Sequence, residues 1–314
     1  MHGQVVTVFG GSGFIGRYVV EQLAARGAVV RVPSRRPERA LFLKPLGAVG
    51  QIVIEPWNPT ASGEVDRLLA GSQHAISLIG ILHESRKGDF DRVQAGFPGE
   101  IGTAAARHRL KRVVHISAIG ADASSKVAYA RTKAAGEAAL RAAFPHATIL
   151  RPSIVFGPED NFFNRFACMS QFLPMLPLIG GGRTRFQPVY VGDVADAVMA
   201  GLSREDVAGR TFELGGPAVY TFRELMAYLL EVTGRRRMLV SLPFGLAALQ
   251  ATVLELLPVP PLTRDQVEML KRDNVVSPGT PGLAELGIGP TPLEVIVPQY
   301  LQTFALPAKR LPVA

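Results

Sequence analysis

The sequence of 314 residues is poor in the residues that cross-link chains or bind metals. Its one cysteine, Cys168, excludes an internal disulfide, so we expect a reducing compartment and a buried thiol that only fills space. Six histidines and no clustered cysteines give no reason to expect a metal site. No apolar run reaches the length of a membrane span without a proline or a charge. A strand is expected within a few residues of Met1, which leaves no room for a signal or transit peptide. We expect a cytoplasmic protein, with a peripheral position on the inner membrane as an open alternative.

Charged residues are also few, at 19%, while hydrophobic residues make up 47% and predict a large core. The length suits one large domain or two fused units. The net charge of +8 allows nucleic acid, an anionic membrane or a phosphorylated ligand as partner. The basic residues lie in separate groups ("SRRPER", "RHRLKR", "GRRR") and form no single stripe. This scatter favours phosphorylated ligands or a membrane surface, and no nucleic-acid partner is expected.

The first half of the chain alternates short apolar runs with helical patterns. The expected strands are "VVTVFG", "AVVRVPS", "VGQIVIEP", "HAISLIG", "RVVHISAIG" and "ATILRPSIVFG", and the helices between them include 15–27, 92–108 and 129–143. This alternation predicts an α/β fold with a Rossmann-type, doubly wound parallel sheet. The carboxyl ends of its strands share one edge, where ligands bind.

The second half is apolar but interrupted by proline and glycine, which predicts a different organisation. We expect residues 1–156 to form the Rossmann core, with 186–232 returning to it. Residues 157–185 and 233–314 are expected to form a small, mostly helical carboxyl-terminal domain for substrate or partner contacts.

The segment "GGSGFIG" follows the first expected strand and opens a helix. In this setting Gly10 permits a tight turn, Gly13 lets a pyrophosphate approach the backbone, and Gly16 allows close packing of helix on strand. The free N–H groups of the helix terminus favour a bound phosphate. A nucleotide site is therefore predicted at Gly10, Ser12, Gly13, Phe14, Ile15 and Gly16.

The end of the second strand indicates which nucleotide binds. It has Ser34, Arg35 and Arg36, with no carboxylate before Glu38. A carboxylate there would bind the ribose 2′-hydroxyl of NADH, whereas an arginine pairs with a 2′-phosphate. NADPH is thus the preferred cofactor over NADH, although at least one arginine is expected to be only solvated.

Further cofactor contacts are expected from position in the fold alone. Glu55 and Asn58 follow the third strand, where an adenine edge would lie. Ile79 and Gly80 follow the fourth strand and would approach the pyrophosphate or the adenosine ribose.

"YARTK" places Tyr129 and Lys133 on one helix face, one turn apart. A nearby ammonium is expected to lower the tyrosine pKa, which suits acid–base work. Ser117 ends the preceding strand and could hydrogen-bond a substrate oxygen. Such a pair is common on helix surfaces, but it becomes specific after a glycine motif and a strand that ends in serine.

The order "GGSGFIG", "HIS", "YARTK", "RPSIVFG" resembles the extended short-chain dehydrogenase/reductase superfamily. More closely it resembles the atypical branch that includes the NAD(P)H-binding accessory subunit of respiratory complex I, and the likeness continues through "QPVYVGDVADAV" and "TRDQVEML". The resemblance implies that Tyr129 and Lys133 flank the nicotinamide ribose and that Arg35 holds the 2′-phosphate. It also implies that Pro152 and Ser153 lie against the nicotinamide.

One departure leaves two functions open. Active superfamily members use an asparagine in the helix after strand four, where this chain has Gln94. One hypothesis is a non-catalytic or weakly catalytic accessory or assembly factor associated with respiratory complex I or its quinone site. The other is an NADP-dependent reductase or dehydrogenase acting on a small apolar carbonyl or quinone precursor, with Ser117, Tyr129 and Lys133 as catalytic residues.

The stretch 238–262 follows "GRRR" and carries almost no charge. A basic cluster beside an apolar helix is typical of docking on an anionic bilayer. An apolar helix is equally typical of a domain core. Both interpretations stay open at this point.

Overall fold

A computed structural model of the chain describes residues 1–255, 257 and 260–306. It contains two compact units. The first consists of Met1–Pro152, Gly192–Glu213 and Thr280–Ile288, and the second of Ser153–Val191, the described part of Leu214–Gly279 and the described residues from Gly289 on. The segment 186–232, expected to return to the core, is divided: 192–213 lies in the first unit, and 186–191 and 214–232 lie in the second.

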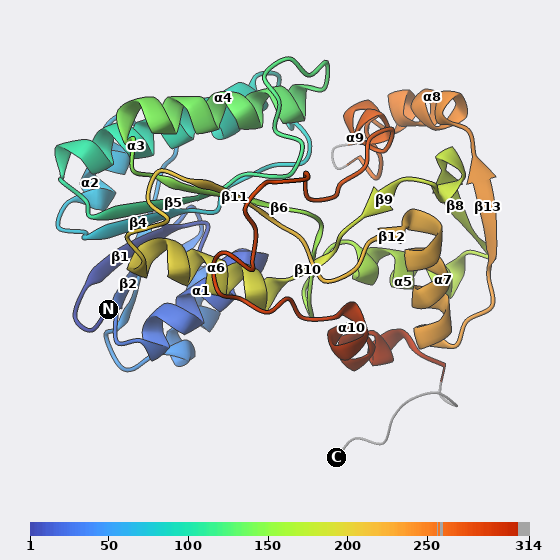
Figure 1. Ribbon diagram of the computed structural model, residues 1–314, viewed down its shortest axis with the longest axis horizontal. Coiled ribbons are helices and arrows are strands. Elements are labelled where there is room, and N and C mark those ends of the chain that lie inside the picture. The colour runs from blue at the N-terminus through green and yellow to red at the C-terminus, as the bar shows by residue number, and fades with distance from the viewer. Residues whose placement is uncertain (256, 258–259, 307–314) are drawn as a thin grey trace. The chain divides into compact units, whose positions relative to one another are not determined.

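The first unit is built on a seven-stranded sheet in the order β11-β6-β5-β4-β1-β2-β3 (Figure 1). The strands are β1 (Val5–Phe9), β2 (Val29–Ser34), β3 (Ile52–Pro56), β4 (His74–Ser77), β5 (Arg112–Ile116), β6 (Thr148–Pro152) and β11 (Thr211–Leu214). They run parallel, which confirms the predicted Rossmann-type sheet. The strand order reverses between β1 and β4. In such sheets the crevice for a ligand opens at the carboxyl ends of the strands on either side of this reversal.

Helices cover both faces of this sheet. Figure 1 shows α2 (Glu64–Leu69), α3 (Phe97–Arg107) and α4 (Ala128–Ala143) on one face, and α1 (Phe14–Ala25) and α6 (Val191–Ser203) on the other. A ten-residue 3₁₀ segment, η1 (Pro37–Leu46), joins β2 to β3. Because both faces are covered, the strands are mostly apolar, as their sequences predict. A hydrogen bond of 2.8 Å from Gln22 of α1 to Asp196 of α6 links the two helices of the second face.

The helix expected over 92–108 has two parts. It begins as a π-helix, η2 (Asp91–Gly96), and continues as α3. Helix α4 packs so closely here that a Cβ on Gly136 would lie 1.9 Å from the carbonyl oxygen of Gln94. The absence of a side chain at Gly136 thus sets the approach of the two helices.

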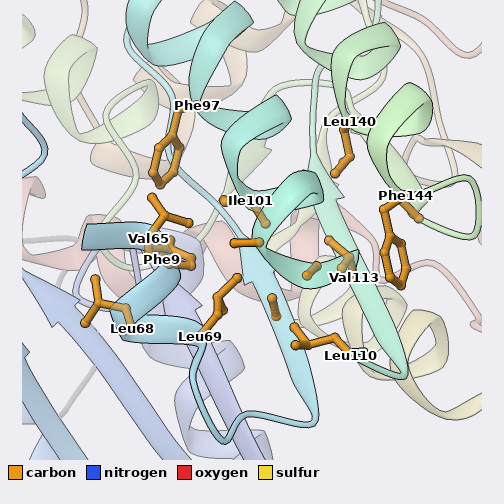
Figure 2. Packing of buried hydrophobic residues seen from close by; sticks show 14 residues of the cluster. Phe9, Val65, Leu68, Leu69, Phe97, Ile101, Leu110, Val113, Leu140 and Phe144 are labelled. Carbon is orange, nitrogen blue, oxygen red and sulfur yellow. The ribbon is translucent and has the colours of Figure 1, made fainter. Parts of the chain in front are cut away.

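One hydrophobic cluster of the first unit lies under α2, α3 and α4 (Figure 2). Phe9, at the end of β1, packs edge-on against Phe97 and Trp57, with ring centroids 5.3 and 5.8 Å apart. Leu68, Ile101 and Leu140 are fully buried around it. The core therefore reaches the carboxyl end of β1, directly beneath the glycine turn.

The second unit has three short strand pairs and several helices. Strands β7 (Val155–Phe156) and β10 (Val189–Tyr190) pair in parallel, as do β8 (Met175–Ile179) and β13 (Met238–Leu242), whereas β9 (Arg185–Phe186) and β12 (Tyr220–Thr221) are antiparallel. The helical segments are α5 (Phe163–Phe172), η3 (Gly180–Gly182), α7 (Phe222–Thr233), α8 (Phe244–Leu254), α9 (Arg264–Met269), α10 (Leu293–Leu301) and η4 (Gln302–Phe304). Phe186 and Phe222 belong to the buried core of this unit, and the partly buried Phe162 and Phe166 pack against them. A helical carboxyl-terminal region is thus confirmed.

Two expectations concern the burial of Cys168 and the presence of a membrane span. Cys168, expected to be buried, is exposed on α5, so that prediction is wrong. Over the described ranges no helix combines the length and the apolar character needed to cross a membrane. The stretch 238–262 contains β13 and α8, and its residues 256 and 258–259 lie outside the described residues.

Candidate cofactor site

The glycine turn is shaped by contacts within the backbone. Strand β1 runs into Gly10, whose φ of +85° lies in the left-handed region that glycine tolerates. The N–H of Gly13 donates to the Gly10 carbonyl at 2.9 Å and closes the turn. A Cβ on Gly16 would lie 2.2 Å from the same carbonyl oxygen and 2.6 Å from the Gly11 backbone. Gly10 and Gly16 are therefore required by the fold itself.

Gly13 differs from these two glycines. It is exposed, its backbone is extended, and a Cβ there would meet only the Gly10 oxygen, at 3.2 Å. Gly13 is the N-cap of α1 and offers no capping side chain, and the first turn holds no acidic residue. The first main-chain bond within the helix runs from Arg17 to Gly13 (3.1 Å), so the N–H groups of Phe14, Ile15 and Gly16 have no acceptor in the helix. Ser12 lies partly buried beside them. This combination of open backbone and free donors suits a phosphate.

The end of β2 is basic and carries no carboxylate. Ser34 is buried, and its hydroxyl accepts a hydrogen bond of 3.2 Å from the N–H of Arg36. Arg35 and Arg36 are exposed, and within the described part of the chain neither pairs with an acidic side chain. Their positive charges are available to an anionic group at this edge of the sheet.

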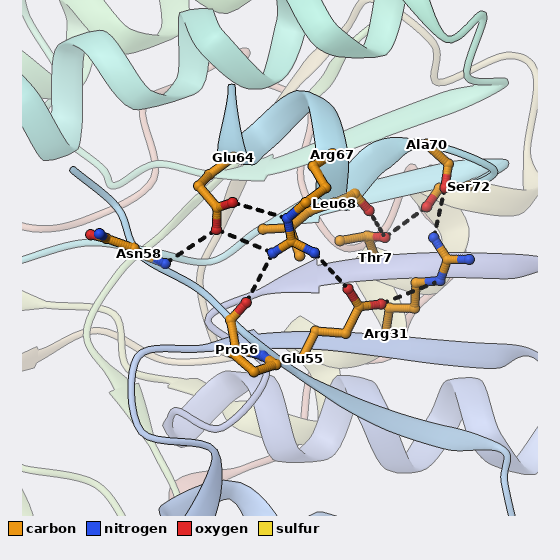
Figure 3. A network of polar contacts seen from close by, with 10 residues as sticks. All are labelled: Thr7, Arg31, Glu55, Pro56, Asn58, Glu64, Arg67, Leu68, Ala70 and Ser72. Carbon is orange, nitrogen blue, oxygen red and sulfur yellow. Dashed lines mark hydrogen bonds and ion pairs between the residues drawn. The ribbon is translucent and has the colours of Figure 1, made fainter. Parts of the chain in front are cut away.

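The third-strand residues are held in a local polar network (Figure 3). Glu55 lies 3.6 Å from the Arg31 guanidinium and 3.5 Å from that of Arg67. The side-chain oxygen of Asn58 accepts two hydrogen bonds from Thr60, at 3.1 and 2.7 Å. Glu55 and the side-chain oxygen of Asn58 thus have partners within the protein. The contact of Asn58 with adenine stays a prediction.

The fourth-strand residues meet the glycine turn at the switch point. The N–H of Leu78 donates to the Phe9 carbonyl at 2.9 Å, and a Cβ on Gly10 would touch the Ile79 side chain at 3.3 Å. A Cβ on Gly80 would lie 3.1 Å from the Lys133 ammonium. The fold thus brings together Gly10, Ile79, Gly80 and Lys133, which are far apart in sequence.

Lys133 is a buried cation, only 4% exposed. Its ammonium donates to the Ile116 carbonyl at 3.4 Å. Burial lowers the pKa of Lys133 to about 8, and Glu137, one turn further along α4, partly offsets this effect. A buried lysine whose pKa is lowered this far is typical of a functional site.

Ser117 follows β5, and its N–H donates to the Leu150 carbonyl at 2.7 Å. Its hydroxyl oxygen is buried and has no hydrogen-bond partner among the described residues. Buried hydroxyls without a partner are rare, and one at the carboxyl end of a central strand fits contact with a bound molecule.

Tyr129 is partly buried, and its ring packs edge-on against Phe90 at 6.2 Å. Burial raises the pKa of Tyr129 to about 12. The predicted lowering of this pKa by Lys133 is therefore wrong, because desolvation of the phenol dominates. The chain alone holds Tyr129 as a neutral phenol.

Gln94 occupies the region where the superfamily pattern has asparagine, and sequence reasoning assigned it no role. It is buried; its amide donates to the Ile81 carbonyl at 2.5 Å and its side-chain oxygen accepts from Thr132 at 3.2 Å. Thr132 directly precedes Lys133, so Gln94 ties the loop after β4 to the helix that carries the lysine. In the sequence, Gln94 could be noticed only as a carboxamide in a helix after a central strand. No local pattern shows that it contacts Ile81 and Thr132.

The residues after β6 have other partners. The carbonyl of Pro152 accepts from the N–H of Ile119 at 3.1 Å. The hydroxyl of Ser153, in the second unit, lies 2.6 Å from the side-chain oxygen of Asn274, to which it donates. Their predicted contact with nicotinamide stays a prediction. Within the described residues there is no cluster of His, Cys, Asp or Glu that could hold a metal.

A glycine turn at the switch point of a doubly wound sheet, followed by a serine, a tyrosine and a buried lysine, defines a Rossmann-type protein of the extended short-chain dehydrogenase/reductase class. The model of the NAD dependent epimerase/dehydratase family matches residues 6–215, and the chain belongs to this family. The residues of the site suit the nicotinamide dinucleotide that the family name implies.

Two relatives extend the comparison beyond the matched region. The chain is 36% identical over 296 residues to NADH dehydrogenase [ubiquinone] 1 alpha subcomplex subunit 9, mitochondrial, from Rattus norvegicus, covering 93% of this chain and 78% of the relative. It is 32% identical over 242 residues to a ceramide reductase from Caulobacter vibrioides, covering 76% and 74% of the two chains. The likeness to a complex I subunit therefore includes both units, as the sequence resemblance predicted.

Solved structures show the same fold at low identity. A dTDP-glucose 4,6-dehydratase from Streptomyces venezuelae with bound NAD gives a TM-score of 0.74 at 20% identity, covering 95% of this chain and 96% of that one. A triphenylmethane reductase from Citrobacter sp. with NADP(H) also gives 0.74, at 19% identity, with coverages of 94% and 99%. Proteins of this fold thus hold either cofactor, and the choice depends on local residues.

Proposed function

We propose that this protein binds NADPH and acts as a non-catalytic or weakly catalytic accessory or assembly factor of respiratory complex I or its quinone site. On this proposal it is cytoplasmic and lies peripherally on the inner membrane. The observation that carries the proposal is the 36% identity to a complex I subunit across 93% of the chain. NADPH bound at the glycine turn would then stabilise the first unit, and the assembled protein would contact other subunits.

The preference for NADPH is supported by the end of β2. Arg35 and Arg36 are exposed without acidic partners in the described structure, and no carboxylate stands between Ser34 and Glu38. A 2′-phosphate near either guanidinium would form a charge-assisted contact, which is about twice as strong as a neutral hydrogen bond. Calorimetric titration tests this directly. Arg35→Ala with Arg36→Ala should weaken NADPH binding while leaving NADH binding unchanged, and an equal loss for both cofactors would contradict the preference.

A clamp role for the tyrosine–lysine pair is supported by its electrostatics. Tyr129 has a pKa raised to about 12, so its proton is held firmly, and Lys133 keeps a buried ammonium beside Gly80. A buried ammonium and a neutral phenol are both hydrogen-bond donors suited to ribose hydroxyls. On this view the pair binds the cofactor, and turnover is secondary.

Native-gel separation of gently solubilised membranes from the source cells tests the accessory role. Co-migration of the protein with NADH:quinone oxidoreductase activity is the expected result. Tyr129→Phe should co-migrate and support that activity equally well, whereas Gly13→Val should reduce the amount of assembled protein. Recovery of the wild type only as a free protein would overturn the accessory role.

A second function is favoured by the hydroxyl of Ser117. An unpartnered buried hydroxyl after β5 could bind the oxygen of a carbonyl while Tyr129 donates a proton and NADPH a hydride. One relative is a ceramide reductase by name, which is consistent with an apolar substrate. The alternative is therefore an NADP-dependent reductase of a small apolar carbonyl or quinone precursor. Oxidation of NADPH with such compounds, abolished by Tyr129→Phe and by Ser117→Ala at unchanged cofactor affinity, would establish it. Full activity in Tyr129→Phe would exclude it.

A further inference from the structure

Helix α8 of the second unit buries two alanines and exposes three of its large apolar residues. Ala247 and Ala251 are fully buried in a cluster with Ile179 and Val267, and Phe244, partly buried, packs against the same cluster. Leu246, Leu249 and Val253 are 54%, 66% and 62% exposed. A helix that completes a core buries its large apolar side chains. The core interpretation of this stretch therefore does not account for the three exposed residues.

The exposed face of α8 is free of charge. From Met238, at the start of β13, to Leu254, at the end of α8, the sequence has no charged residue. Eleven residues span about 16 Å, roughly half the hydrocarbon thickness of a bilayer. Such a helix cannot cross a membrane, but its length and polarity suit a position in the plane of the interface.

A basic cavity adjoins the start of this helix. It has a volume of about 450 Å³ and is lined by Arg183, Arg223, Ser241 and the glycines of η3. Ser241 belongs to β13, and a Cβ on Gly180 would collide with the ring of Phe244, the first residue of α8. The cavity therefore opens where β13 runs into α8.

The two arginines of this cavity lack acidic partners. Arg183 and Arg223 are exposed, and no carboxylate pairs with either in the described structure. Some cations of the same unit do have acidic partners: Arg185 pairs with Asp273, Arg264 with Glu255 and Lys271 with Glu268. Two uncompensated guanidinium groups beside an uncharged apolar helix complement a surface that is anionic at its face and apolar beneath.

We propose that this surface, made of Leu246, Leu249, Val253, Arg183 and Arg223, docks on an anionic phospholipid bilayer. Helix α8 lies in the interface with its three large side chains among the acyl chains. The arginine cavity receives the phosphate of one lipid headgroup. The inference deepens the peripheral membrane position of the proposed function. The surface belongs to the second unit alone, so vesicle binding can fail while cofactor binding and the accessory role stand, and the reverse.

Sedimentation of the full-length protein with vesicles tests the apolar half of the surface. The wild type should bind phosphatidylcholine vesicles that contain phosphatidylglycerol. The variant Leu246→Gln/Leu249→Gln/Val253→Thr should bind them at least about tenfold more weakly, because it loses the burial of three large apolar side chains. Val295→Thr, which changes an exposed apolar residue of α10, is the matched control and should bind as the wild type does.

Vesicles of phosphatidylcholine alone test the basic half. Arg183→Gln/Arg223→Gln should remove the preference for phosphatidylglycerol and leave the weaker binding to neutral vesicles unchanged. Arg185→Gln, at the paired arginine, should retain the preference. A double variant with an intact preference would overturn the role of the cavity.

Two further outcomes would overturn the inference as a whole. One is failure of the wild type to sediment with anionic vesicles. The other is a concentration-dependent dimer that the triple variant abolishes, which would show that a second copy of the chain covers α8. Leu249→Trp provides a readout that needs no polar substitution. Its emission should shift to the blue with anionic vesicles, and an unchanged spectrum would also overturn the inference.

Discussion

Adding one methyl group to Gly13 or to Gly16 should show which glycine the fold requires and which one cofactor binding requires. At Gly16 the new Cβ lies 2.2 Å from the Gly10 carbonyl oxygen, so the backbone must move. Overpacking of this kind costs about 1–3 kcal/mol or more, and the better helix propensity of alanine returns only about 0.5–1 kcal/mol. Gly16→Ala should therefore destabilise the protein even without cofactor.

At Gly13 the same change should cost the free protein much less than at Gly16. The backbone there has φ −80° and ψ −177°, which alanine adopts freely, and the nearest atom, the Gly10 carbonyl oxygen at 3.2 Å, need move by only a few tenths of an ångström. A methyl group would instead occupy the space through which a pyrophosphate approaches the N–H groups of α1. At a concentration about 100 times its dissociation constant, NADPH stabilises a protein by about 2.7 kcal/mol. Gly13→Ala should lose most of that stabilisation.

Thermal unfolding with and without NADPH measures both effects. The wild type should gain roughly 5–10 °C with the cofactor at this saturation. Gly13→Ala should melt near the wild type without NADPH and gain little with it. Gly16→Ala should melt several degrees lower under both conditions. A full NADPH shift in Gly13→Ala, or an unchanged melting temperature in Gly16→Ala, would refute the reasoning.

Three other substitutions follow from buried charges in the first unit. Burial lowers the pKa of Lys133 from 10.5 to about 8, so the buried ammonium destabilises the free protein. Lys133→Met should raise the free energy of unfolding by about 2–3 kcal/mol, measured by urea unfolding at pH 7, and should weaken NADPH binding. A less stable variant would contradict this. Burial lowers the pKa of His115 from 6.5 to about 3. The unfolded chain therefore binds a proton that the folded chain does not, and the stability falls as the pH drops below about 6.5. His115→Asn should remove this loss, which is about 2 kcal/mol at pH 5, as measured by urea unfolding. Glu137→Gln breaks a buried bidentate pair with Arg151 (2.8 and 2.7 Å) and should cost about 2–4 kcal/mol, whereas Glu205→Gln, at a side chain that is 94% exposed, should leave the urea midpoint unchanged.

The sheet and the glycine turn were predictable because they depend on local patterns. Apolar runs of strand length alternate with amphipathic helices, and the glycine spacing fixes where α1 begins. The hydrophobic period of three and four residues on α1 appears directly in the burial of Val19, Val20 and Leu23.

The features that sequence reasoning missed depend on partners distant in the chain. The π-helix at Asp91–Gly96 accompanies the close approach of Gly136, which no local pattern shows. The raised pKa of Tyr129 comes from desolvation, which a one-turn spacing from Lys133 does not reveal. Helix α8 is apolar around its circumference, so its sequence did not specify which face packs.

The edge of the sheet at β6 has a consequence for the order in which the chain folds during synthesis. Strands β1 to β6 are complete once Pro152 has been made, but β11, which covers the free edge of β6, ends at Leu214. Residues 153–191 of the second unit are synthesised in between. While they emerge, β6 presents unpaired N–H and C=O groups to the solvent, which makes this interval the stage at which a nascent chain is most exposed to strand addition by a neighbour. Ribosome-bound chains stalled before residue 211 should therefore aggregate or recruit a chaperone more readily than chains stalled after residue 288, where all three segments of the first unit are present.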